Sequence, residues 1–355
     1  MIGVDIGSSS IKIVQLARKS GRAVLQTYGE LSLGPYASTE VGRSTNLPPE
    51  KIAEALKDVI RESKATATSA GLSIPFGASL ITAIEMPALS EKQFPQMIPL
   101  EARKYVPVPI SEVTLDWWVI PKNVSRSPQF SDQEKKVGAA EKIDVLLVAI
   151  HNQILAKYQT IINQAKLQTS FFEIEIFSTL RSVADQEFVS QMIIDLGAAS
   201  TKMYIVEQGV VRASHVVSRG AQDVTLAMSR ALSVSVQTAE IMKRDINQVP
   251  ENRKNEIASI ISVTLDYIFS EAHQVILNYQ RKYNKDVPKV FMVGGGAMLK
   301  GILPYAEERL QTSVALGDPF GKTEAPAFLS EVLKTTGPEF AVAVGVALRK
   351  LGELG

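Results

Sequence analysis

The sequence contains no cysteine. This absence excludes disulfide bonds, thiol nucleophiles and thiolate metal sites, and it fits a reducing compartment. The three histidines, His151, His215 and His273, lie far apart along the chain and show no HxxxH spacing. Because a zinc site needs several imidazole or carboxylate ligands that converge, we expect no zinc centre.

Long apolar runs and an excess of one charge are also missing. No segment reaches the roughly 18–20 apolar residues that a membrane-spanning helix requires, so we expect no direct membrane insertion. The start of the chain lacks the basic and apolar regions of a signal peptide, which predicts a cytoplasmic protein. Because a strand pattern begins almost at Met1, it stays open whether a short native leader is missing. Lysine and arginine number 38 against 37 aspartate and glutamate residues, so no net field favours nucleic acid as a partner.

What is present indicates a globular α/β protein with more than one core. A chain of 355 residues, 45% of them hydrophobic, suits two domains or a subdivided pair. Apolar periodicity separates the strands from the helices. The expected order is three strands over 2–33, a helix over 50–64, a strand over 70–75, an insert over 78–149, a helix over 152–166, a strand over 169–176, a helix over 178–185, a second strand–turn–strand unit from 191, helices over 221–284 with a break at 247–252, a strand before Gly294, a helix after Lys300 and a final helix over 340–351.

The insert has the pattern of a small separate core. Three strands are expected in it (SLITAIEM, VTLDWWVI and KIDVLLVAI), together with one helix. Ser90 is the expected cap of this helix, which runs toward Tyr105 and is stopped by Pro107 and Pro109. The polar segment 122–142 predicts an exposed flexible loop.

An internal repeat connects the two halves of the chain. The segment DIGSSSIK begins at Asp5, and DLGAASTK begins at Asp195, a domain length later. Each segment follows an apolar strand and leads into another. Either copy alone is compatible with a plain hairpin, because Asp and Gly suit tight turns. Two copies in register favour a functional pair. The shared positions are Asp5/Asp195, Gly7/Gly197, Ser10/Ser200 and Lys12/Lys202.

The repeat predicts two hairpins that face each other across a cleft and hold a polyphosphate. Gly7 allows the backbone to approach an anion closely, and the N–H groups and hydroxyls around Ser9 supply donors. Lys12 adds a positive charge. A carboxylate cannot bind phosphate directly, but Asp5 and Asp195 can hold Mg²⁺ or its waters, and the metal then bridges to phosphate oxygens.

A run of three glycines, Gly294 to Gly296, lies between an apolar strand and a helix. It offers a flat backbone surface for a purine or its α-phosphate beside a helix N-terminus, although a sharp strand-to-helix turn is the alternative. The sequence lacks GxxxxGK[ST] and has no GxGxxG after its first strand. These absences argue against a Walker-type phosphate loop and a Rossmann fold.

These three segments, in this order and spacing, resemble the actin-like ATPase superfamily. The segment FAVAVGVALRKLG, with Gly345 between small apolar residues, resembles its late connecting helix. Within the superfamily the chain is most similar to the PilM family of type IV pilus assembly proteins, and then to FtsA cell-division proteins. The insert segment from Ile74 to Val119 is the most distinctive part. The resemblance implies an α/β fold, namely the actin-like (ribonuclease H-like, duplicated) two-domain ATPase fold with an inserted small α+β subdomain.

The resemblance also implies a division into four parts. They are a first core subdomain (1–77 with 150–190 and 338–355), an inserted partner-binding subdomain (78–149), a second core subdomain (191–224 with 285–337) and a helical subdomain (225–284).

The resemblance implies a role for each site residue in binding ATP and Mg²⁺. Glu175 would position water, although a charged residue closing a strand is the alternative. Asp195 would take part in catalysis, and Asp5 and Asp195 would hold Mg²⁺ through water. Glu240 and Lys243 would reach ribose and base, with an ordinary solvated helix face as the alternative. The remaining nucleotide contacts would come from Asp5, Gly7, Ser8, Ser9, Ser10 and Lys12 in the first hairpin, Gly197, Ser200 and Thr201 in the second, and Gly294, Gly295 and Gly296 beside adenosine.

A protein partner is implied as well. Members of this family bind the short cytoplasmic N-terminal peptide of PilN, a single-pass membrane protein, and so lie at the inner membrane through their partner. Other proteins of the pilus platform are further possible partners. The expected groove residues on the insert helix are Phe94, Ile98, Ala102 and Tyr105. The alternative is that this spacing lets the helix cover its own sheet.

The predicted function is therefore ATP binding coupled to peptide binding, with at most weak ATPase activity. One alternative is a small-molecule kinase of the same fold, although no segment has the pattern of a polar sugar pocket with a carboxylate base. The other is an FtsA-like filament protein. For that alternative we expect a C-terminal amphipathic helix, and the sequence given ends at Gly355, directly after the connecting helix. Oligomeric state is left open.

Overall fold

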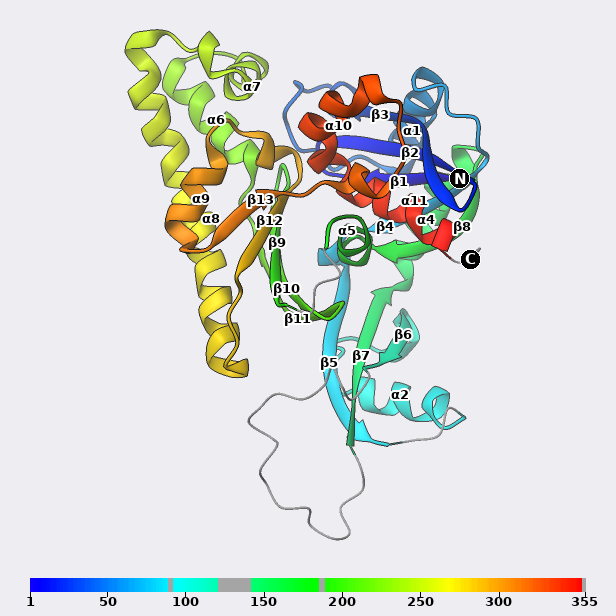
Figure 1. Ribbon diagram of the computed structural model, residues 1–355. Helices are drawn as coiled ribbons and strands as arrows, with labels where there is room; N and C mark the ends of the chain where they lie inside the picture. Colours follow the sequence, from blue (N-terminus) through cyan, green and yellow to red (C-terminus); the bar gives the residue numbers. More distant parts are fainter. Residues whose placement is uncertain (89–91, 121–141, 185–188, 353–355) are drawn as a thin grey trace.

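The computed structural model describes residues 1–88, 92–120, 142–184 and 189–352. Three sheets organise them (Figure 1). The first sheet has the order β3-β2-β1-β4-β8, the second β11-β10-β9-β12-β13, and the small third sheet β5-β7-β6. The strands of the first are β1 (Ile2–Ile6), β2 (Ser10–Lys19), β3 (Arg22–Ser32), β4 (Ser69–Ile74) and β8 (Gln168–Ile174). Those of the second are β9 (Gln191–Leu196), β10 (Thr201–Glu207), β11 (Val210–Val217), β12 (Lys289–Val293) and β13 (Ser313–Leu316).

The two large sheets are copies of one another in strand direction and register. Each pairs its first three strands antiparallel and adds two parallel strands. Asp5 lies opposite Lys12, and Asp195 lies opposite Lys202. Each long hairpin also shifts its register at the same place, after the third residue beyond that lysine. The sequence repeat therefore marks a structural duplication, and the actin-like fold is confirmed.

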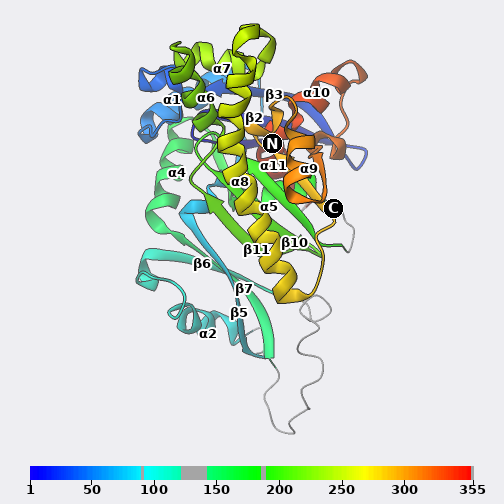
Figure 2. The same cartoon turned by 90° about the vertical axis from the view of Figure 1, so that its left-hand side faces the viewer.

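Helices cover both faces of each large sheet (Figures 1 and 2). Apolar side chains of α1 (Pro49–Glu62) and α4 (Asn152–Gln164) pack against the first sheet, and those of α8 (Lys254–Tyr283) and α9 (Ile302–Leu310) against the second. Two helices, α5 (Glu175–Val183) and α11 (Ala341–Gly352), lie between the sheets. Their inner position places the N-terminus of α5 beside the turns of both hairpins.

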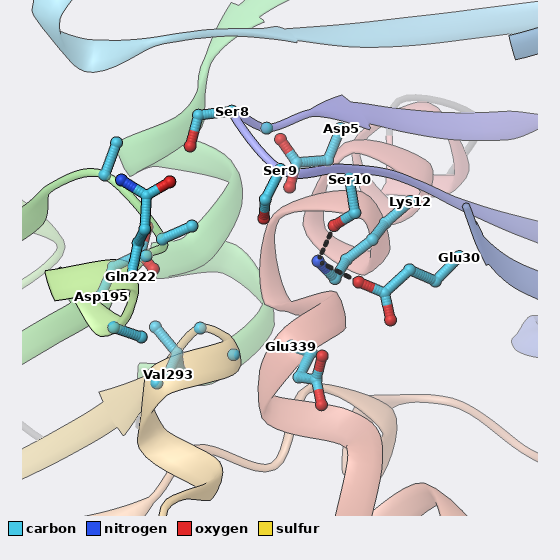
Figure 3. A pocket seen from close by; sticks show the side chains of 18 of the residues that line it. Asp5, Ser8, Ser9, Ser10, Lys12, Glu30, Asp195, Gln222, Val293 and Glu339 are labelled. Carbon is cyan, nitrogen blue, oxygen red and sulfur yellow. Dashed lines mark hydrogen bonds and ion pairs between the residues drawn. The ribbon is translucent and has the colours of Figure 1, made fainter. Parts of the chain in front are cut away.

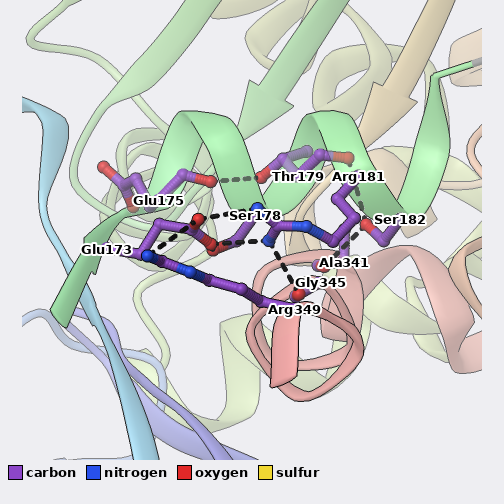
Figure 4. Close-up of polar contacts among 9 residues, drawn as sticks. All are labelled: Glu173, Glu175, Ser178, Thr179, Arg181, Ser182, Ala341, Gly345 and Arg349. Carbon is purple, nitrogen blue, oxygen red and sulfur yellow. Dashed lines mark hydrogen bonds and ion pairs between the residues drawn. The ribbon is translucent and has the colours of Figure 1, made fainter. Parts of the chain in front are cut away.

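The crossing of α5 and α11 depends on a small residue and a buried ion pair. A β-carbon on Gly345 would lie 1.8 Å from the carbonyl oxygen of Ser178, so only glycine permits this approach. Beside it, the Arg181 guanidinium binds both oxygens of the buried Glu173 carboxylate, at 2.6 and 2.7 Å, and donates to the Gly345 carbonyl (Figure 4). Arg349 from α11 lies 3.3 Å from the same carboxylate. The two helices are therefore fastened to each other and to β8.

The insert forms its own core. Helix α2 (Phe94–Ala102) covers one face of the sheet made by β5 (Ser79–Pro87), β6 (Val113–Val119) and β7 (Lys142–His151). The N-cap of this helix is Gln93 and not the expected Ser90, which lies outside the described residues, and the helix ends before Tyr105. Its predicted extent was therefore too long at both ends. The expected loop over 122–142 falls almost wholly on residues outside the described ranges.

A helical unit completes the fold. Helix α6 (Ala221–Leu232), helix α7 (Val236–Arg244) and the start of α8 share a small apolar core that includes Val224, Met228 and Ile257. Helix α10 (Ser330–Thr336) precedes α11. Among the described residues, none of the helices combines the length and the apolar character needed to cross a bilayer.

Candidate nucleotide-binding site

The turns of the two repeated hairpins meet in a cavity of about 130 Å³ between the large sheets (Figure 3). Gly7 donates its N–H to Ser10 O at 3.0 Å, and Gly197 donates to Ser200 O at 3.1 Å, so both turns have the same form. The lining includes Asp5, Gly7, Ser8, Ser9, Ser10, Lys12, Glu175, Asp195, Gly197, Ser200, Glu240, Lys243, Gly294, Gly295 and Gly296. The two hairpin turns therefore line the same cavity, as the repeat predicts.

Asp5 ends β1 beneath the first turn. Its Oδ1 accepts a hydrogen bond from Ser73 Oγ at 2.9 Å. Burial raises the pKa of this carboxyl group, and the charges of Lys12 and Lys202 only partly oppose the effect. A buried carboxylate at this point attracts a cation into the cavity.

Lys12 is held by Glu30 rather than by Asp5. Its Nζ donates to Ser10 Oγ at 2.8 Å and lies 3.0 Å from Glu30 Oε1 (Figure 3). The register shift between β2 and β3 causes this contact, because it places Glu30 and not Gly29 opposite Lys12. Burial lowers the pKa of Lys12, but the negative charges of Glu30, Asp5 and Glu339 together outweigh burial and raise it overall. A charged ammonium group therefore lies at the first turn.

The second hairpin pairs its lysine differently. Lys202 Nζ lies 2.9 Å from Glu175 Oε2 and 3.2 Å from Asp195 Oδ2. The residue opposite Lys202 on β11 is Val216, which has no charge to offer. Lys202 therefore turns into the cavity toward the two carboxylates.

Glu175 is the first residue of α5, and the strand before it ends at Ile174. Its Oε1 accepts from Phe76 N at 2.6 Å. Burial is the main cause that raises the pKa of Glu175, and the charge of Asp195 raises it further. Glu175 therefore follows the end of a strand and also lines the cavity, and its role in positioning water stays a prediction.

A second, more apolar recess of about 230 Å³ continues from the first. Its walls come from α6, α8 and the glycine run, and a β-carbon on Gly296 would lie 2.3 Å from Leu196 Cγ. The apolar lining consists of Leu196, Val224, Leu265, Ile268, Met298 and Leu299. A flat apolar ring has a suitable environment here, beside a polar phosphate cavity.

Glu240 and Lys243 lie at the junction of the two recesses and are bound to each other at 2.6 Å. Thr225 Oγ1 donates to Glu240 Oε2 at 2.7 Å and receives a hydrogen bond from Lys243 Nζ at 2.9 Å. Burial raises the pKa of Glu240, but Lys243, Thr225 and Arg244 together outweigh burial and lower it overall. Only 7% of Glu240 is exposed, so the solvated-face alternative is wrong.

A loop from the first half of the chain crosses to the helical unit above the cavity. Glu40 Oε2 accepts from Val236 N, at the first turn of α7, at 2.9 Å. Ser44 N donates to the side-chain oxygen of Gln222 on α6, and Thr45 N donates to Ser8 O at 2.7 Å. Residues Glu40–Thr45, called the strap below, therefore join the first hairpin to α6 and α7.

Two sets of predicted residues are placed elsewhere. Thr201 is fully buried and donates to Arg219 O at 2.8 Å, outside the cavity lining, which corrects its assignment to the nucleotide. Phe94, Ile98 and Ala102 are buried in the core of the insert. This corrects their assignment to a peptide groove, because they cover their own sheet. Tyr105 remains 43% exposed.

Several cavity residues were missed by sequence reasoning. They are Glu30, Gln222, Arg244 and Glu339, the strap residues Val41 and Gly42, and Lys202. The spacing of the repeat was a sufficient signal for Lys202. Glu30 reaches the cavity through a strand register, and Val41 and Gly42 through an irregular loop. Gln222 and Arg244 lie on α6 and α7, and Glu339 precedes α11, so the packing of these helices decides their place.

The carboxylates match a cation that arrives with its own ligands. Within the ranges that the structure covers, no three histidine or acidic side chains are arranged to hold a metal ion. Mg²⁺ usually keeps several waters and takes one or two carboxylates together with phosphate oxygens. Asp5 and Asp195 meet that smaller requirement, with one oxygen of Asp195 shared with Lys202.

Comparison with known proteins identifies a family. The profile of the family described as type IV pilus assembly protein PilM matches residues 3–351. FtsA of Bacillus subtilis (strain 168) is 22% identical over 247 residues, which cover 62% of this chain and 55% of that protein. FtsA of Neisseria meningitidis serogroup B is 24% identical over 187 residues, covering 46% and 43%. The chain spans about half the length of these curated relatives.

Solved structures share the fold over nearly the whole chain. A PilM–PilN type IV pilus biogenesis complex superimposes with a TM-score of 0.81 at 22% identity, covering 99% of this chain and 98% of that chain. EutJ of Carboxydothermus hydrogenoformans gives a TM-score of 0.57 at 15% identity, covering 98% and 88%. MreB5 of Spiroplasma citri bound to AMPPNP gives 0.53 at 12% identity, covering 99% and 97%.

Proposed function

The chain belongs to the PilM family of type IV pilus assembly proteins, and on that premise we propose that it binds ATP between its two hairpins and couples this binding to capture of a PilN-type peptide. The observation that carries the proposal is the duplicated turn. Asp5 and Asp195 lie at equivalent strand ends and line one cavity.

The nucleotide would lie across both recesses. Its phosphates would accept from the N–H and hydroxyl groups of Ser8, Ser9 and Ser10, with Lys12 as the nearby positive charge. Its base would occupy the apolar recess against the glycine run, with Glu240 and Lys243 near the ribose. Mg²⁺, when bound, supplies charge neutralisation between the phosphates and the waters held by Asp5 and Asp195.

A short path of contacts connects this cavity with the insert. Glu175 lines the cavity and accepts from Phe76 N, and Phe76 begins the single 3-10 turn (Phe76–Ala78) that leads into β5, the first strand of the insert. The side chains of Phe76 and Ile81 pack against the core around α5. A nucleotide that moves Glu175 therefore acts directly on the base of the insert, which supports coupling between the two sites.

The peptide surface has to be sought among exposed side chains. Leu100 and Tyr105 are 50% and 43% exposed at and just beyond α2, and Trp118 is 48% exposed on β6. Exposed large apolar side chains are suited to an apolar peptide segment. Trp117 packs with the α2 core, so its neighbour Trp118 lies on the opposite face of the insert sheet. We propose that PilN-type capture uses the side that carries α2, with Leu100 and Tyr105, which would place the protein at the inner membrane through its partner.

Thermal unfolding tests the nucleotide half of the proposal. A ligand that binds only the folded state at about 100 times its Kd adds about 2.7 kcal/mol of stability. Mg-ATP should raise the melting temperature of the native chain and have little effect on Asp195→Asn. Asp266→Asn, at an exposed position of α8 that lines neither recess, serves as the control and should respond like the native chain. If Mg-ATP does not raise the melting temperature of the native chain after bound nucleotide has been removed, the hairpins have only a structural role.

Peptide binding tests the other half. A synthetic PilN-type N-terminal peptide should bind the native chain more tightly with Mg-ATP than without it. Tyr105→Ala should weaken binding, whereas Phe328→Ala, at an 81% exposed side chain outside the insert, should not. Equal affinity with and without nucleotide would contradict the coupling.

The similarity to FtsA keeps one alternative function in view. A filament-forming protein would sediment at high protein concentration with ATP, whereas the proposed platform subunit would stay in the supernatant.

A further inference from the structure

The ammonium group of Lys202 binds two carboxylates that hydrolysis of a bound nucleotide would need free. Lys202 Nζ binds Glu175 Oε2 at 2.9 Å and Asp195 Oδ2 at 3.2 Å, and only 20% of its side chain is exposed. The side chains of Glu175 and Asp195 are 9% and 10% exposed. The contact is therefore a desolvated one, which water and salt screen weakly.

The arrangement is specific to the second copy of the repeat. Lys12, at the equivalent position of the first copy, is drawn away by Glu30 on the neighbouring strand. Lys202 faces Val216 at the corresponding place. The substitution of an apolar residue for an acidic one on the third strand thus directs the second lysine into the cavity.

The two partners of Lys202 are the groups that hydrolysis would require. Hydrolysis breaks the bond between the terminal phosphorus and its bridging oxygen and forms a bond to a water oxygen, and a nearby group must orient that water and take its proton. Glu175 is the buried carboxylate placed for this task, but one of its oxygens accepts from Phe76 N and the other from Lys202. Each oxygen keeps a further lone pair, but the positive charge of Lys202 opposes the rise in the pKa of Glu175 that burial causes, so Glu175 is a weaker base toward water than it would be without Lys202.

An ammonium group has three N–H donors. Glu175 and Asp195 take two of those of Lys202, which leaves one for an oxygen of a phosphate in the cavity. Lys202 can therefore supply part of the positive charge that a polyphosphate otherwise receives from a divalent cation.

We propose that Lys202 is a positioning residue that acts as a built-in counter-ion: it reduces how strongly ATP binding depends on Mg²⁺ and keeps Glu175 from acting on water. The inference rests on the proposed nucleotide binding and specifies its consequence. The protein keeps its nucleotide as a ligand and does not turn it over.

Lys202→Met tests the proposal, because methionine keeps an unbranched chain of similar length without the charge. Mg²⁺ without nucleotide should raise the melting temperature of Lys202→Met, since Asp195 and Glu175 then lack a cation, and should leave that of the native chain unchanged. Chelating Mg²⁺ should weaken ATP binding by about tenfold or more in the variant and much less in the native chain. Phosphate release from ATP should be faster in the variant.

Lys202→Arg is the matched control, because it keeps the positive charge and should restore native behaviour in all three measurements. A purely structural lysine would show no such selective response to Mg²⁺. If Lys202→Met folds and its affinity, melting response to Mg²⁺ and phosphate release equal those of the native chain, the proposal is overturned.

Glu175→Gln keeps the test decisive if Lys202→Met does not fold. Because Lys202 already restrains Glu175, this change should alter phosphate release from the native chain by less than about twofold, within the effect of one weak hydrogen bond. A loss of tenfold or more would show that Glu175 acts on water with Lys202 in place, and would refute the proposal. Failure of the native chain to bind ATP at all is a separate outcome, and it removes the proposed function itself.

Discussion

The carboxylate of Asp195 occupies the space that a side chain on Gly294 would need. A β-carbon at Gly294 would lie 2.5 Å from Asp195 Oδ1 and 2.7 Å from Leu196 O, and the backbone there has φ of +84°. Two of the three glycine-rich segments of the sequence therefore meet in a single contact. Gly294 N also donates to Pro338 O at 2.9 Å, which ties this contact to the segment before α11.

Gly294→Ala should destabilise the fold by about 2–4 kcal/mol, from the positive φ together with the clash on Asp195. Gly301→Ala is the matched control, because Gly301 has φ of +82° but nothing within 4 Å of an added β-carbon. It should cost only about 1 kcal/mol. Urea unfolding of both variants measures the difference, and equal costs would mean that Asp195 moves aside freely.

Gly345→Ala should be more damaging, because the added carbon would overlap the Ser178 carbonyl oxygen in the crossing of α5 and α11. We expect a loss of about 3 kcal/mol or more, or failure to fold. Gly352→Ala, near the end of the same helix and in open space, should change stability by less than about 1 kcal/mol, toward greater stability. Denaturant midpoints give the comparison, and a mild effect at Gly345 would contradict the close helix approach.

Glu30 and Glu339 face the same cavity but should respond to pH in opposite directions (Figure 3). Burial raises the pKa of Glu30, but Lys12, Ser10 and Arg244 together outweigh burial and lower it below its ordinary value of 4.5. Its charge therefore stabilises the fold above that value, and this stability is lost as pH falls through the lower folded pKa. Burial and then the charge of Glu30 raise the pKa of Glu339. Its charge therefore costs stability at neutral pH, and the cost disappears as pH falls below 4.5.

Glu30→Gln should accordingly lower the stability at pH 7, whereas Glu339→Gln should raise it. Both differences from the native chain should shrink in acid, as the native carboxyl groups become protonated. Urea unfolding between about pH 3 and pH 8 measures both. If both substitutions change the free energy of unfolding in the same direction at neutral pH, Lys12 does not give the two carboxyl groups opposite effects on stability.

The strap should control how fast a nucleotide leaves. Glu40→Gln removes a negative charge from the first turn of α7, where it accepts from Val236 N. Such a charge at a helix N-terminus is worth about 0.3–1 kcal/mol, so nucleotide release should become about two- to fivefold faster. Glu50→Gln, in the first turn of α1, is the matched control. Stopped-flow release of a fluorescent ATP analogue measures both variants. Identical release rates would show that the strap does not keep the site closed.

Much of the site was predictable because the informative residues occur as a repeat. Asp5 and Asp195 end buried strands, and glycine follows two residues later in both copies, so local pattern alone places both turns. Glu30 was not predictable, because a one-residue register shift decides whether Glu30 or Gly29 faces Lys12. The prediction of a peptide groove on α2 was wrong for a related reason. The spacing of Phe94, Ile98 and Ala102 shows that α2 has an apolar face, but only the tertiary structure shows that the insert sheet already covers it.

The sequence by itself therefore determined the duplicated fold and the turns that face the cavity, since strand periodicity and glycine placement are local properties of the chain. Only the tertiary structure decided how the charges pair. Lys12 and Lys202 occupy equivalent positions in the repeat, yet one binds Glu30 and the other binds Glu175 and Asp195. That choice depends on which residue the neighbouring strand and α5 bring within hydrogen-bonding distance, and such partners lie far away in sequence.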